Sequence, residues 1–214
     1  MIPEVLHFVW LGSKLPEDEI KNISSWERFN PYLTIKIWTD KHISDLDFSE
    51  GAMKAFEAGD GIYAYQSDIM RQHIINKFGG FYSDTDIECR KPIPRNFFSK
   101  DYVFLKPHPR ANWFNPAFFG VHTDSDLMTQ MTEGIVEKDK EEVNSRRCYI
   151  YGPQYFTRVI KAYAGLTIQD SVTDLPTKIK NCLLLDRDFW RPKNPNRYCT
   201  HYAKASWRKG MSRK

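Results

Sequence analysis

The sequence of 214 residues contains no apolar run of about 18 residues, which excludes a helix that crosses a membrane. The opening stretch, MIPEVLHFVWLG, lacks a basic region and carries Glu4 and His7 among its apolar residues, so it is not a secretory signal. The four cysteines are scattered, with no C-x-x-C pair and no zinc spacing. We therefore predict free thiols and a cytoplasmic location, in the host cytoplasm if the protein is viral.

Internal repeats and low-complexity segments are also missing. A chain of this length buries enough apolar surface to fold without disulfides or a structural metal, so we predict a single domain over residues 1–214. Aromatic residues make up 14% of the chain. That share is typical either of a protein that stacks on flat or ring-shaped ligands or of an aromatic core, and both interpretations stay open.

Acidic side chains are absent after Asp188, whereas eight lysines and arginines follow that residue. The first 188 residues carry 23 basic and 27 acidic side chains, so an acidic body precedes a basic tail. This asymmetry suits a phosphate ligand or an anionic surface. The alternative is a solvated terminus that binds nothing.

Strand and helix patterns alternate along the chain. We expect strands at residues 5–11, 33–38, 81–88, 102–106 and 117–122, and helices at residues 16–28, 51–58, 61–78, 127–138 and 154–164. Gly79 and Gly80 are expected to end the third helix as a C-cap. The alternation predicts an α/β fold with a mostly parallel sheet, in which ligands bind beyond the carboxyl ends of the strands.

Acidic triplets of the form Asp-x-Asp occur four times: Asp45-Leu46-Asp47, Asp84-Thr85-Asp86, Asp124-Ser125-Asp126 and Asp186-Arg187-Asp188. The second follows a capped helix and is predicted to lie on an apolar strand, where Asp84 and Asp86 would point to the same face. Two such carboxylates are best accommodated by a divalent metal that also binds diphosphate oxygens. Two solvated acids are the alternative, and the fourth triplet, after the apolar run CLLL, is the competing metal site.

The preceding helix carries a second candidate pair. Asp68 and Arg71 are three residues apart and share a helix face. They form either a surface ion pair that contributes little to stability or part of a site. In the second case Asp68 would accept hydrogen bonds from sugar hydroxyls, and Arg71 would contact hydroxyls or phosphate.

Residues 64–93, AYQSDIMRQHIINKFGGFYSDTDIECRKPI, resemble the sugar-binding DXD region of the family 32-type glycosyltransferases. That group includes yeast α-1,6-mannosyltransferase-like and bacterial capsular polysaccharide enzymes. The block is also similar to the catalytic domain of the large clostridial glucosylating toxins. Three further segments agree with the same group, namely residues 2–12, Tyr151-Gly152-Pro153 with Thr157, and the sequence HYAKASW at residues 201–207.

The resemblance implies a GT-A fold, which is Rossmann-like, with a single mixed, mostly parallel sheet flanked by helices. It also implies a metal-dependent enzyme that transfers a sugar with retention of configuration, and Mn²⁺ or Mg²⁺ as the cofactor. The donor would be a nucleotide diphosphate sugar, with a UDP-sugar such as UDP-glucose favoured, and the acceptor a glycan or a protein. Residues 189–214 would form a basic segment that closes over the diphosphate, and no nucleic-acid partner is expected.

The resemblance also assigns the site residues. Catalytic roles fall to Asp68, Arg71, Asp84 and Asp86, and the metal ligands are Asp84, Asp86 and His201. The nucleotide sugar would be bound by Val9, Trp10, Asp68, Arg71, Ser83, Asp84, Thr85, Asn115, Ser206 and Trp207. Simpler roles remain open for four of these: a core tryptophan at position 10, a surface histidine at 201, a plain turn at 115 and a tail anchor at 207.

Three other functions could account for parts of this sequence. A haloacid-dehalogenase-type phosphatase would have Asp-x-Asp-x-Thr on its first strand, whereas this triplet lies far into the chain and is followed by Glu88. A sugar-nucleotide-binding domain without turnover would keep the same motif, so it remains the main alternative. A nucleic-acid binder is disfavoured, because the basic tail contains no recognisable binding module.

Overall fold

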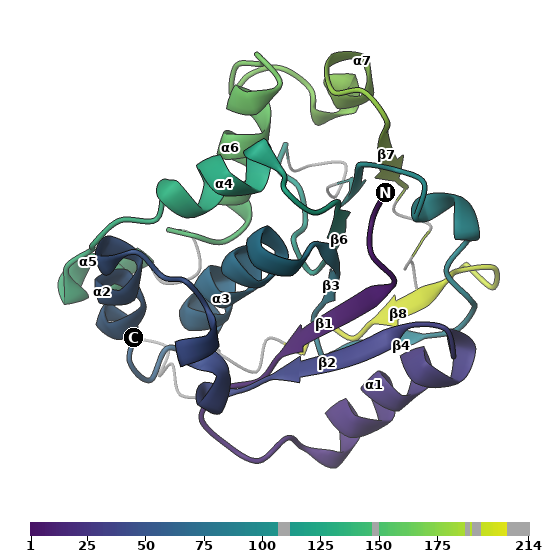
Figure 1. Cartoon of the computed structure of the whole chain (residues 1–214), viewed down its shortest axis with the longest axis horizontal. Coiled ribbons are helices and arrows are strands. Elements are labelled where there is room, and N and C mark those ends of the chain that lie inside the picture. Colours follow the sequence, from purple (N-terminus) through teal and green to yellow (C-terminus); the bar gives the residue numbers. More distant parts are fainter. Residues whose placement is uncertain (107–111, 147–149, 187–188, 190–193, 205–214) are drawn as a thin grey trace.

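The computed structural model describes residues 1–106, 112–146, 150–186, 189 and 194–204. A six-stranded sheet crosses the molecule in the order β2-β1-β3-β6-β5-β7 (Figure 1). Its strands are β1 (Val5–Val9), β2 (Thr34–Trp38), β3 (Gly80–Ser83), β5 (Tyr102–Leu105), β6 (Phe118–Val121) and β7 (Cys182–Leu185). Strand β6 runs antiparallel to both neighbours, and the other pairings are parallel. The predicted α/β class with a mostly parallel sheet is confirmed.

A second sheet was not expected from the sequence. Strands β4 (Ile87–Cys89) and β8 (Cys199–His201) pair antiparallel beside the main sheet. Each has only three residues, which is too short for a period-2 pattern to be recognised. This small sheet brings the end of the described chain next to the acidic triplet.

Helices cover both faces of the main sheet (Figure 1). They are α1 (Glu17–Phe29), α2 (Glu50–Ala58), α3 (Tyr63–Phe78), α4 (Asp126–Glu133), α5 (Lys140–Arg146), α6 (Pro153–Tyr163) and α7 (Leu175–Lys178), with 3₁₀ turns at Asp40–Asp45, Arg95–Phe97 and Val172–Asp174. Helix α1 packs against β4, while α3 packs on β1 and against α4. One apolar cluster fills the α3 side and a second fills the α1 side, so the sheet is covered by two layers.

The turn between α3 and β3 depends on two glycines. Gly79 and Gly80 have φ angles of +61° and +91°, which residues with a Cβ rarely adopt. A Cβ added at Gly80 would lie only 2.8 Å from the carbonyl oxygen of Val5. The predicted glycine C-cap is thus confirmed, and it lets β3 start directly beside β1.

His7 of β1 is buried and neutral. Its Nε2 lies 3.1 Å from the carbonyl oxygen of Gly79, and its Nδ1 accepts a hydrogen bond of 3.0 Å from the Trp38 indole. Burial lowers the pKa of His7 to about 4. Because Nδ1 must accept a hydrogen bond, protonation of this ring would break its hydrogen bond with Trp38 of β2.

The structure also bears on the cysteines and on membranes. Cys89, Cys182 and Cys199 are free thiols, as predicted, and Cys148 lies outside the described residues. None of the described helices is long and apolar enough to cross a membrane.

Candidate active site

The acidic triplet lies in a turn and not on a strand, so the expected strand at residues 81–88 is wrong in its centre. Strand β3 ends at Ser83, Thr85 and Asp86 form a turn, and β4 begins at Ile87. The alternation of faces in a strand therefore cannot explain why the two carboxylates meet. The turn follows the carboxyl end of β3, where α/β sheets bind ligands.

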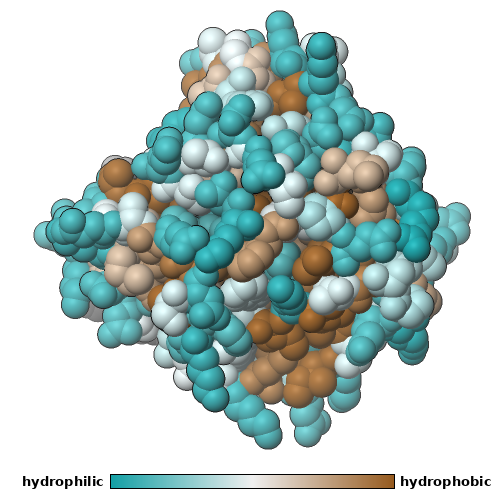
Figure 2. Space-filling view, in the orientation of Figure 1, coloured by the Kyte–Doolittle hydropathy of each residue, from teal (hydrophilic) through white to brown (hydrophobic). Residues whose placement is uncertain are grey.

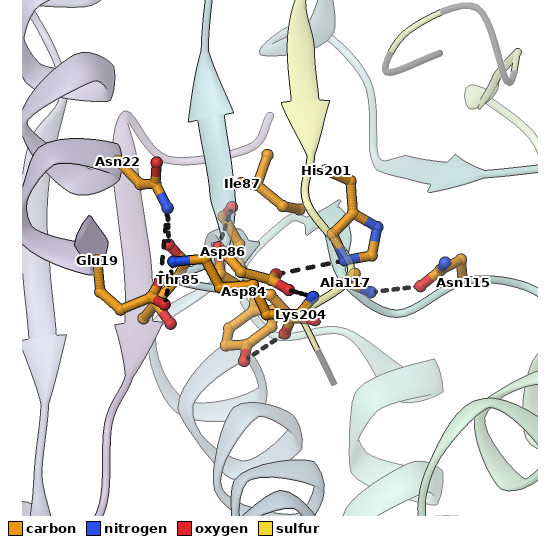
Figure 3. A network of polar contacts seen from close by, with 12 residues as sticks. Glu19, Asn22, Asp84, Thr85, Asp86, Ile87, Asn115, Ala117, His201 and Lys204 are labelled. Carbon is orange, nitrogen blue, oxygen red and sulfur yellow. Dashed lines mark hydrogen bonds and ion pairs between the residues drawn. The ribbon is translucent and has the colours of Figure 1, made fainter. Parts of the chain in front are cut away.

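Three side chains converge at this turn. The ligand atoms of Asp84, Asp86 and His201 all lie within 4.8 Å of one another, and each residue is half-buried. His201 is positioned by the small sheet, in which it pairs with Ile87, the residue after Asp86. Its Nε2 lies 3.3 Å from Oδ1 of Asp86 (Figure 3). The structure thus brings together the three predicted metal ligands, and a role of His201 as a plain surface histidine does not fit.

The two carboxylates differ in their electrostatics. Burial raises the pKa of Asp84, and the nearby Asp86 adds to this, against the opposing effect of Arg71. Burial also acts on Asp86, but the hydrogen bond and charge of His201 and the backbone N–H of Lys204 more than offset it and lower its pKa. Burial disfavours the charged imidazole, yet Asp86 and Asp84 together raise the pKa of His201. A cation among these groups would therefore relieve the unfavourable charge on Asp84.

Arg71 contacts the acidic turn from the protein interior. It forms an ion pair with Asp68 in which both side chains are buried, with exposed fractions of 6% and 7%. Its Nη1 also lies 3.5 Å from Oδ1 of Asp84, which accepts a hydrogen bond of 2.9 Å from the hydroxyl of Tyr82. The interpretation of Asp68 and Arg71 as a surface ion pair is therefore wrong, because the pair is interior and reaches the acidic turn.

A second set of contacts holds the turn from the side of α1 (Figure 3). Asn22 donates a hydrogen bond of 2.9 Å to the carbonyl oxygen of Thr85. The backbone N–H of Lys204 donates to Oδ2 of Asp86 at 2.9 Å, and its ammonium lies 3.0 Å from Glu19. Sequence reasoning missed these three contributors. The sequence of the first turn, with Glu17, Asp18 and Glu19, indicates only acids favourable to the helix dipole, although Glu19 is the one buried acid of that turn.

The remaining predicted residues are arranged around this turn. Trp10 directly follows the carboxyl end of β1, on the side of the sheet where β3 ends. It is half-buried and belongs to neither apolar cluster, so it is not a core tryptophan. Val9 is buried in the core. Ser83 is buried and its hydroxyl donates to the carbonyl oxygen of Asp84.

Asn115 is linked to the turn through Ala117. Its side-chain oxygen accepts a hydrogen bond from the N–H of Ala117, whose carbonyl oxygen accepts one from the N–H of Asp84 (Figure 3). This arrangement fits the plain-turn role and leaves contact with a donor sugar as a prediction. Ser206 and Trp207 lie outside the described residues.

The competing triplet at residues 186–188 follows β7, which is an edge strand of the main sheet. Asp186 is 76% exposed and pairs with Lys106 at 3.5 Å, while Arg187 and Asp188 lie outside the described residues. The described part of this triplet is thus a solvated acid with one half-buried lysine beside it, unlike the half-buried cluster at Asp84 and Asp86.

Comparison with known families agrees with this site. Residues 16–105 match the family described as "Glycosyltransferase sugar-binding region containing DXD motif". The matched range contains Glu19 and Asn22 of α1, the Asp68–Arg71 pair and the acidic turn. The predicted resemblance to the DXD glycosyltransferases is therefore confirmed, and the prediction of an enzyme of that class is supported.

Two curated relatives show partial similarity. The Subversion of eukaryotic traffic protein A of Legionella pneumophila is 28% identical over 130 residues, which cover 50% of this chain and 20% of that protein. The Inositol phosphoceramide mannosyltransferase 1 of Schizosaccharomyces pombe is 31% identical over 122 residues, covering 53% of this chain and 38% of the yeast protein. The chain thus spans well under half the length of these relatives.

A solved structure shares the fold. The PaToxG glycosyltransferase superposes with a TM-score of 0.62 at 19% identity, covering 76% of this chain and 70% of that one. This likeness confirms the predicted GT-A fold.

Proposed function

We propose that the chain is a metal-dependent glycosyltransferase that moves a sugar from a nucleotide diphosphate sugar to a glycan or protein acceptor. The observation that carries this proposal is the convergence of Asp84, Asp86 and His201 at the end of β3. That convergence occurs within a chain whose residues 16–105 match a glycosyltransferase sugar-binding region. The donor proposed first is a UDP-sugar such as UDP-glucose.

The three converging side chains fit a divalent cation. Two carboxylates and one imidazole are ligands that suit Mn²⁺, and carboxylates alone would suit Mg²⁺. Oδ1 of Asp86 is buried and lies 3.3 Å from Nε2 of His201, so one cation placed between these two atoms would be ligated by both of them. Asp84, Asp86 and His201 would hold the ion, which when bound supplies positive charge against the negative charge that develops on the leaving diphosphate.

Other residues of the chain would bind and orient the donor. Trp10, half-buried after the carboxyl end of β1 and next to β3, would stack on the nucleotide base. Arg71 keeps Asp84 in place from the interior. The C-terminal segment, whose described part reaches Lys204, would close over the diphosphate and exclude water.

Retention of configuration is proposed to proceed by departure and attack on one face of the sugar. Asp68 and Asp84 are the acids within reach of Arg71, and both are paired with its guanidinium. Such pairing lowers their availability as covalent nucleophiles, which supports the front-face route over a two-step displacement.

The test is a thermal-shift screen of UDP-sugars and GDP-sugars with and without Mn²⁺. GDP-sugars are included because the yeast relative is named a mannosyltransferase. A donor at 100 times its dissociation constant stabilises the fold by about 2.7 kcal/mol, which corresponds to roughly 5–11 °C for a chain of this size. Asp86→Asn is the matched control, in which the Mn²⁺-dependent part of the shift should vanish.

Turnover is measured on the same samples as release of the nucleotide diphosphate. Binding without hydrolysis or transfer to any acceptor would favour the sugar-nucleotide-binding domain. Failure of every nucleotide sugar to bind would reject the proposed function.

A further inference from the structure

We propose that Glu19 of α1 is a positioning residue, which acts through Lys204 to orient the Asp86 carboxylate for metal binding. The inference rests on the proposed metal-dependent function and adds a residue to it that no motif identified. It follows from the arrangement of one buried carboxylate, one lysine and one backbone N–H.

The contacts form a chain from α1 to the candidate metal ligands (Figure 3). Oε1 of Glu19 lies 3.0 Å from the ammonium of Lys204. The backbone N–H of the same lysine donates to Oδ2 of Asp86 at 2.9 Å. Oδ2 is therefore occupied, and the other oxygen, Oδ1, is buried and faces Nε2 of His201 at 3.3 Å. The carboxylate is thus oriented with Oδ1 among the candidate metal ligands.

Helix α1 holds the acidic turn at a second point. Asn22, one turn after Glu19, places its amide nitrogen 2.9 Å from the carbonyl oxygen of Thr85 and 3.4 Å from Oε2 of Glu19. On the other side, the N–H of Tyr202 donates to the carbonyl oxygen of Asp86 at 3.0 Å. The turn is therefore held between α1 and the segment after β8. The contact between Glu19 and Lys204 links these two elements.

The burial of Glu19 is not explained by the helix dipole. Glu17 and Asp18 occupy the same first turn and are exposed, where they complement the dipole without desolvation. Glu19 is only 5% exposed, and burial of a carboxylate is costly unless it is paired. Its charged partner is Lys204, 185 residues away in the sequence. A buried acid with this partner ties the C-terminal segment to the body of the domain.

Residues that orient a metal ligand typically change metal affinity by about 10- to 100-fold when they are replaced. Glu19→Gln keeps the size of the side chain and removes its charge, and Lys204→Met removes the ammonium while keeping the backbone N–H. The matched control is Asp18→Asn, because Asp18 neighbours Glu19 and lies 3.5 Å from the same ammonium but is 72% exposed.

The first measurement is the Mn²⁺ affinity of the full chain, determined by electron paramagnetic resonance. We expect Glu19→Gln and Lys204→Met each to weaken Mn²⁺ binding by about 10- to 100-fold, and the double variant to be no weaker than the single ones. Asp18→Asn should stay within about twofold of the unsubstituted chain, because an exposed partner contributes little.

The second measurement needs no metal. Hydrogen exchange of the Lys204 amide reports its hydrogen bond to Asp86, so its protection should fall in Glu19→Gln and persist in Asp18→Asn. Unchanged Mn²⁺ affinity and unchanged amide protection in both Glu19→Gln and Lys204→Met would overturn this inference alone. An unsubstituted chain that binds no Mn²⁺ would overturn the proposed metal dependence and this inference with it.

Discussion

Replacement of Arg71 by methionine is expected to destabilise the fold by about 3–5 kcal/mol, the cost of breaking a buried ion pair by removing one partner. The side chains of Arg71 and Asp68 are 6% and 7% exposed, so the carboxylate left behind has little access to bulk water. Asp84 also loses a partner, but it is 33% exposed and solvent can compensate there. The penalty therefore comes mainly from Asp68.

The assay is urea unfolding followed by circular dichroism, with a thermal scan in parallel. A loss of about 3–5 kcal/mol corresponds to a drop of roughly 6–20 °C in Tm for a chain of this size. The double variant Asp68→Leu with Arg71→Met should recover much of the loss, because neither charge then remains buried. The matched control is Lys54→Met, which breaks an exposed pair with Glu50 and should cost well under about 1 kcal/mol.

The result that would refute this reasoning is a loss below about 1 kcal/mol for Arg71→Met, equal to that of Lys54→Met. The Asp68–Arg71 pair would then behave as a solvated pair, and its placement beneath the acidic turn would have no energetic meaning. A double variant that is less stable than Arg71→Met would equally contradict an unpaired Asp68 as the source of the penalty.

Three further outcomes are expected. Asp86→Asn should abolish metal-dependent turnover and weaken Mn²⁺ binding with Tm nearly unchanged. Asp186→Asn should leave turnover and Mn²⁺ binding intact, since that acid is 76% exposed and outside the cluster. The opposite pattern would show that the metal binds at the Asp186 triplet instead. Burial lowers the pKa of both His7 and His73 to about 4, so the stability that each neutral ring provides is fully present above pH 6.5 and is lost as pH falls towards 4. Each should contribute about 3 kcal/mol to this loss, and a flat free energy of unfolding between pH 7 and 4 would contradict it. Trp10→Ala should weaken UDP binding by roughly 1–3 kcal/mol if the indole stacks on the base, measured by calorimetry, and an unchanged affinity in a folded variant would exclude stacking.

Local patterns were sufficient for much of the fold. The glycine pair after α3 could be recognised because positive φ angles are a property of glycine itself. Helix α1 was predicted to within a residue at each end, since Pro16 and the acids that follow mark a helix start in the sequence. Asp68 and Arg71 are three residues apart on one helix, and this spacing was enough to indicate that they share a helix face.

The sequence by itself determined which residue types are available for the site. Asp84 and Asp86 were chosen from four similar triplets by their context after a capped helix, and His201 by its resemblance to a known motif. The expected strand geometry of this triplet is nevertheless wrong, because the triplet lies in a turn. A turn between two short strands leaves no periodic signal, so its geometry could not be derived from spacing.

Only the tertiary structure decided how these groups are held together. The pairing of β4 with β8 places His201 beside Asp86, although more than a hundred residues separate them. Burial of Glu19 and its contact with Lys204 depend on the same pairing. Local sequence patterns report which backbone conformation a segment prefers, whereas burial and long-range contacts depend on which segments pack against each other, and it is those contacts that set the charge and orientation of the site.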